Sequence, residues 1–139
     1  MQRMKCANTT GRFRRTGFVI AIGGAALIAG ATSGRAADAC ASLKDLKIED
    51  TTITAAESVP AGPFTAPDSK SYPNLPAFCR VTAIVSPVHD SAIRLEMWLP
   101  QDGWKSVFEG TGNGGYSGVF NYPILAAGLR RGMSRAARM

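Results

Sequence analysis

Apolar and polar residues alternate most clearly in two segments near the middle of the chain. Residues 79–85 and 93–99 both show the period of two that is typical of a half-buried β-strand. A short turn with Pro87 and His89 separates them, so we predict an antiparallel pair. In the second segment one face comprises Ile93, Leu95, Met97 and Leu99, and the other comprises Arg94, Glu96 and Trp98.

Weaker patterns surround this pair. Residues 40–48 indicate at most a short helix, and the β-branched run 51–54 predicts a strand. The Pro- and Gly-rich segment 59–76 is predicted to be loop, because proline fixes φ and lacks a donor for a ladder.

The second half of the chain follows a strand, loop and helix order. Residues 107–108 start a predicted strand that runs into the glycine-rich loop 110–115. Asn121 is a suitable N-cap, and Pro123 suits the first turn of a helix whose apolar residues continue to Leu129. The predicted fold class is α/β. The layout matches the opening of an α/β-hydrolase sheet, although pattern alone does not single that fold out.

Residues 1–36 have the features of an export signal. Arg12, Arg14 and Arg15 precede the apolar run 17–28, and small residues then permit cleavage before Ala37 or before Cys40. The run is shorter than the roughly 20 residues of a membrane span. We expect a secreted or periplasmic protein without stable membrane association after cleavage. A retained N-terminal anchor is the alternative.

The net charge of +6 arises at the two ends of the chain. Residues 1–36 hold six basic and no acidic side chains, the last ten residues hold four Arg, and all ten acidic residues lie between. A nucleic-acid surface needs Lys and Arg clustered on one folded face, so we expect no nucleic-acid partner.

Cys40 and Cys79 follow the predicted signal, whereas Cys6 lies inside it. In an oxidising compartment the pair predicts a disulfide, with two separate buried thiols as the alternative. One histidine and two spaced cysteines do not supply a ligand cluster, so no metal or other cofactor is expected.

The loop 110–115 does not fit the nucleotide-binding motifs, because it lacks the Lys of a P-loop and the later acidic residue of a dinucleotide site. A tight turn that needs positive φ is the simpler interpretation. The other interpretation is an oxyanion-hole loop, since α/β-hydrolases place one after their third strand.

In order along the chain, several segments resemble the tannase and feruloyl esterase family. The matching segments are 40–43, 59–64, 75–81, 90–93, 96–100, 103–104 and 108–115. This resemblance implies an N-terminal part of an α/β-hydrolase that cuts aromatic (gallate- or ferulate-type) esters through a serine acyl-enzyme. It implies that Gly114 and Gly115 contribute to the oxyanion hole.

The family's Ser-Asp-His segments, and the lid that holds calcium in several members, come later than the matched residues, so no catalytic residue is assigned here. We expect a signal in 1–36, an incomplete hydrolase domain in 37–132, and an atypical tail in 133–139 that indicates a frameshift or premature end. The chain is then expected to be inactive. Ser117 with His89 and Asp90 imitates a triad, but neighbouring His and Asp suit that geometry poorly. The alternative function is a small exported β-rich binding module.

Overall fold

The computed structural model describes residues 32–115 and 117–139. Most of the predicted export signal therefore lies outside the described residues, and its last five residues begin a helix. Within these ranges, no helix combines the length and apolar character needed to cross a membrane. The elements are α1 (Thr32–Ser42), the 3₁₀ turn η1 (Leu43–Asp45), β1 (Thr51–Val59), β2 (Gly62–Thr65), β3 (Ser71–Leu75), β4 (Phe78–Val85), β5 (Ile93–Pro100), β6 (Phe108–Thr111), α2 (Tyr122–Arg130) and β7 (Ser134–Arg138).

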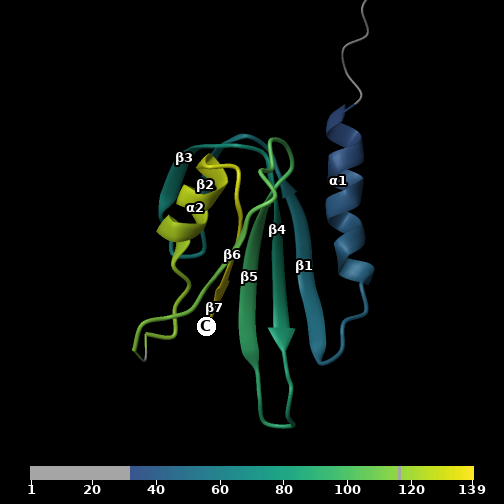
Figure 1. The fold of residues 1–139 in the computed structure, drawn as a ribbon, viewed down its shortest axis with the longest axis vertical. Coiled ribbons are helices and arrows are strands. Elements are labelled where there is room, and N and C mark those ends of the chain that lie inside the picture. The colour runs from purple at the N-terminus through teal and green to yellow at the C-terminus, as the bar shows by residue number, and fades with distance from the viewer. Residues whose placement is uncertain (1–31, 116) are drawn as a thin grey trace, which may run out of the picture.

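Five strands form one mixed sheet in the order β1-β4-β5-β7-β6 (Figure 1). All neighbours are antiparallel except β6 and β7, which are parallel and joined through α2. The predicted antiparallel pair is confirmed, because β4 and β5 pair continuously from Phe78 opposite Pro100 to Val85 opposite Ile93. The α/β prediction is thus confirmed at the level of a mixed sheet with few helices.

The prediction of loop throughout 59–76 was wrong, because β2 and β3 form an antiparallel hairpin there. Both strands of an isolated hairpin are edges, so a proline that cannot donate to a ladder is tolerated. Pro63 lies at the irregularity between Gly62 and Phe64, and Pro73 is likewise outside the paired positions.

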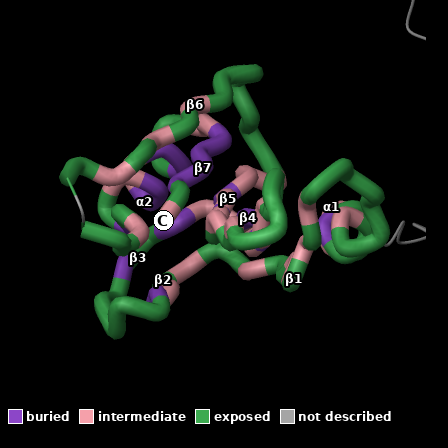
Figure 2. Tube along the Cα trace, turned by 90° about the horizontal axis from the view of Figure 1, so that it is seen from below, coloured by how far each residue is buried: buried purple, intermediate pink, exposed green. Residues whose placement is uncertain are grey.

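Each face of the sheet is covered by different elements. The main core packs α2 and the hairpin against one face, with Phe78, Trp98 and Leu125 fully buried. A smaller core under α1 contains Cys40 and Cys79. In Figure 2 the buried segments lie around α2, β5 and β7, while α1 stands beside β1 as a separate coil.

Glu96 is the most buried acidic side chain described, with 1% of its surface exposed. The guanidinium of Arg80 donates to both carboxylate oxygens, at 2.7 and 3.2 Å. Trp98 donates its indole N–H at 2.9 Å, and Tyr122 donates its hydroxyl at 3.2 Å. Four hydrogen bonds therefore offset the cost of removing the Glu96 carboxylate from water. This explains how β5 can direct a charged side chain toward the main core, on the same face as Trp98.

Stability should fall at alkaline pH because of Tyr122. Burial, followed by the nearby charge of Glu96, raises the pKa of Tyr122 from 10.0 to about 12. The folded state holds this proton more tightly than the unfolded chain, so its contribution is complete below pH 10 and is lost as pH rises toward 12. Urea denaturation across this window should show a steeper loss for wild type than for Tyr122→Phe. Equal slopes would contradict the prediction.

The last strand, β7, lies inside the sheet between β5 and β6, although sequence analysis assigned no strand there. Arg135 is only 8% exposed, pairs with Glu109 and donates to the carbonyl of Ile124, but its Nε has no partner. Gly128 of α2 makes room for this side chain. A Cβ at Gly128 would meet the Arg135 side chain, with Nε at 2.7 Å.

Candidate functional site

The glycine-rich loop connects β6 to α2, as predicted. The helix begins where expected, with the Asn121 side chain accepting the backbone N–H of Ile124 at 3.3 Å. Gly115 and Gly118 have φ values of +61° and +55°, which favour glycine. Within the predicted loop 110–115, the tight-turn interpretation is therefore correct at Gly115, and Gly118 lies just beyond that loop.

Two cavities lie against this loop. The first, of about 390 Å³, is lined by Gly114 and Ser117 together with Asp68 and Lys70 of the hairpin turn. The second, of about 370 Å³, is lined by Gly115 and residues at the ends of β5 and β7, including Arg138. Gly114 and Gly115 thus border different cavities, so the two predicted oxyanion residues are not brought into one described pocket.

The imitation triad is not assembled. His89 and Asp90 lie in the β4–β5 turn with side chains 99% and 95% exposed, joined only to each other at 2.8 Å. Ser117 lies in the β6–α2 loop, and the two segments are apart in Figure 1. An exposed His-Asp pair without a nucleophile beside it cannot deprotonate an attacking hydroxyl.

The predicted disulfide is present between Cys40 and Cys79, whose Cα atoms lie 5.6 Å apart. It ties the end of α1 to β4 inside the smaller core. Among the described residues, no three His, Cys, Asp or Glu side chains are grouped so that they could hold a metal ion.

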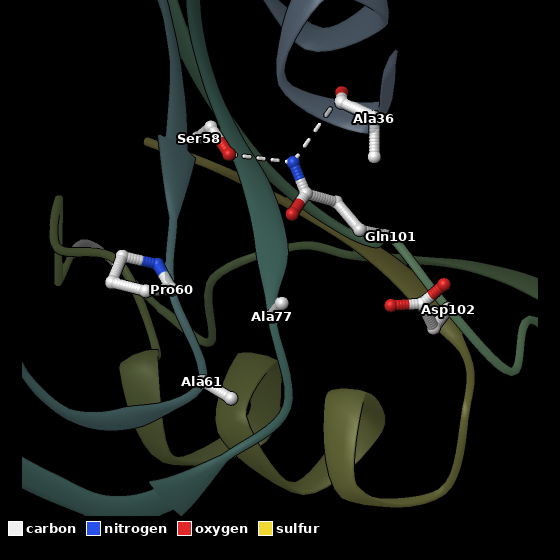
Figure 3. A pocket seen from close by; sticks show the side chains of 7 residues that line it. All are labelled: Ala36, Ser58, Pro60, Ala61, Ala77, Gln101 and Asp102. Carbon is white, nitrogen blue, oxygen red and sulfur yellow. Dashed lines mark hydrogen bonds between the residues drawn. The ribbon is translucent and has the colours of Figure 1, made fainter. Parts of the chain in front are cut away.

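A further cavity of about 330 Å³ lies where α1, β1 and the end of β5 meet (Figure 3). The Gln101 amide donates to the Ser58 hydroxyl at 2.7 Å and to the Ala36 carbonyl at 3.5 Å. This serine faces an amide and not a base, so the cavity lacks the arrangement that activates a nucleophile. Gln101 instead connects three elements.

No protein-family model matches the chain. An uncharacterised esterase of Xanthomonas campestris is 43% identical over 105 residues, which are 76% of this chain and 18% of that protein. A probable feruloyl esterase B-2 of Aspergillus flavus is 41% identical over 56 residues, which are 40% of this chain and 11% of that protein.

Solved structures agree with these relatives. Feruloyl esterase B from Aspergillus oryzae aligns with a TM-score of 0.66 and 27% identity, covering 74% of this chain and 21% of that structure. An esterase from the same organism aligns with a TM-score of 0.65 and 28% identity over 73% of this chain and 22% of that structure. The chain therefore spans about a fifth of the length of these proteins. Over about three quarters of its own length, it is related in sequence and fold to esterases, feruloyl esterases among them.

Proposed function

We propose that this chain is the opening part of an exported carboxylic ester hydrolase that acts on aromatic esters through a serine acyl-enzyme. The observation that carries the proposal is the 43% identity with an esterase over 105 residues. The Aspergillus flavus relative is a probable feruloyl esterase and one similar solved structure is a feruloyl esterase, which supports an aromatic acyl group.

The order of elements supports an α/β-hydrolase origin. The glycine-rich loop follows β6 and leads into α2, and all three lie within residues 37–132. In α/β-hydrolases the loop between the third strand and the first helix donates one backbone N–H to the oxyanion hole. We assign this role to Gly114 or Gly115, and because they border different cavities we expect one of them to be the donor.

The oxyanion role can be tested in a chimera. Residues 37–132 replace the matching segment of the Xanthomonas campestris esterase, and kcat for methyl ferulate is measured. Gly114→Pro deletes one backbone N–H, and loss of one oxyanion-hole donor should lower kcat about 100-fold. Ser117→Ala, in the same loop, should leave kcat unchanged. Circular dichroism verifies that each variant is folded.

The outcomes separate the two claims. A folded chimera without esterase activity would contradict the ester hydrolase proposal. If the chimera is active and Gly114→Pro leaves its kcat unchanged, the ester hydrolase proposal stands and Gly114 is not the oxyanion donor.

We further propose that residues 1–36 are a cleaved export signal, that 37–132 belong to the hydrolase domain and that 133–139 depart from it. A buried arginine whose Nε lacks a partner is uncommon inside a sheet, which supports a non-native segment at β7. On this view the chain alone does not hydrolyse methyl ferulate. Turnover by the purified chain that Ser117→Ala abolishes would contradict this.

An exported binding module without catalysis is the second candidate. The observation that favours it is a closed core on both faces of the sheet, fastened by the disulfide. A soluble monomer with cooperative unfolding would support the module, whereas aggregation through the free sheet edges would support the fragment.

A further inference from the structure

A basic groove lies at the end of α2 opposite the glycine-rich loop. It is a shallow depression of about 680 Å³ that is largely open to solvent. Lys105, Arg130 and Arg131 line it together with a single acidic residue, Asp102. Between the residues described, none of these four side chains forms an ion pair, so the groove keeps an excess of positive charge.

Backbone contacts hold the basic side chains in place. Gly132 turns the chain after α2 with φ of +73°, and a Cβ there would meet the Gly103 carbonyl at 2.6 Å. The Lys105 N–H donates to the Gly132 carbonyl at 2.9 Å, and its Cγ lies 3.3 Å from that Cβ position. Lys105 is thereby packed across the turn that also carries Arg131.

The remaining wall comes from the β2–β3 hairpin. Arg130 donates from Nη2 to the Pro73 carbonyl at 2.8 Å, which fixes its guanidinium beside the hairpin. The apolar lining that solvent reaches is Ala61 and Pro76, because Leu75 and Leu129 are buried. Near the end of α2, the carbonyls of Gly128 and Leu129 already accept the N–H groups of residues 131–133, so these two carbonyls need no cation from the groove.

We propose that this groove binds a small organic anion, with a phosphate or carboxylate facing Lys105 and Arg131 and an apolar body against Ala61 and Pro76. Because the depression is open to solvent, we expect charge to supply most of the affinity, with a smaller contribution from the apolar contact. This binding is independent of ester hydrolysis, because it uses neither the glycine-rich loop nor its cavities.

Isothermal titration of the full chain with phenyl phosphate at low ionic strength tests the proposal. Phenyl phosphate should bind more tightly than inorganic phosphate, which tests the apolar contact. Benzoate should bind and neutral benzyl alcohol should not, which tests the need for a negative charge. Lys105→Gln and Arg131→Gln should each raise the Kd for phenyl phosphate about fivefold, because each removes one solvated ion pair. Asp102→Asn should strengthen binding, and added salt should weaken it.

The matched control is Arg138→Gln, an exposed arginine that does not line the groove. It should leave affinity unchanged. Absence of saturable binding, or an equal loss in Arg138→Gln, would overturn the proposal, because general attraction to a basic chain would then account for the result.

Discussion

Replacing Glu96 by alanine should lower the free energy of unfolding by about 3–5 kcal/mol. The cost arises because the substitution leaves the half-buried Arg80 guanidinium without its main counterion. It also removes the acceptor of the Trp98 indole and the Tyr122 hydroxyl, both inside the main core. Since small domains are stable by about 5–15 kcal/mol, chemical denaturation should detect this loss readily.

Arg80 also contacts a second carboxylate, which provides the control. Glu57 lies 3.4 Å from the guanidinium, but its side chain is 59% exposed. An exposed pair contributes about 0–1 kcal/mol, so Glu57→Ala should be close to neutral. If Glu96→Ala and Glu57→Ala lower the free energy of unfolding by similar amounts, burial does not account for the strength of the Glu96 contacts.

Removing the disulfide should cost about 4 kcal/mol in the chain-entropy description, because the bond closes a loop across a sequence separation of 39. The double variant Cys40→Ala with Cys79→Ala should therefore unfold at much lower denaturant. We expect α1 to detach first, since the core beneath it has only three buried residues, Cys40, Cys79 and Val81.

Dithiothreitol provides the internal comparison for this prediction. It should lower the wild-type midpoint to about that of the double variant and leave the double variant unchanged. A wild-type midpoint that does not respond to reduction would mean that the cross-link does not stabilise the fold.

Local sequence signals predicted those elements whose own residues decide the structure. The β4–β5 pair follows from strict alternation and a short turn, and its register is continuous. The start of α2 follows from Asn121 and Pro123, because an N-cap is a contact within one turn. The cysteine count and the predicted export signal were enough to predict the disulfide.

Features that depend on distant partners could not be predicted in this way. Alternation alone places Glu96 with the polar residues of its strand, and its burial depends on Tyr122 from α2 and Arg80 from β4. Strand β7 has no strand signal in its Ser-Arg-Ala-Ala-Arg sequence, and its place follows from the crossover after α2. For the candidate site, spacing located the glycine-rich loop but not its division between two cavities.

The contact between Gly128 and Arg135 constrains how this chain can evolve. A lineage that first acquires alanine at 128 meets a clash with Arg135, whereas one that first shortens residue 135 makes alanine at 128 acceptable. The two orders of substitution that lead to the same double variant therefore differ in the stability of their intermediates. Any history of these positions should pass through residue 135 before residue 128.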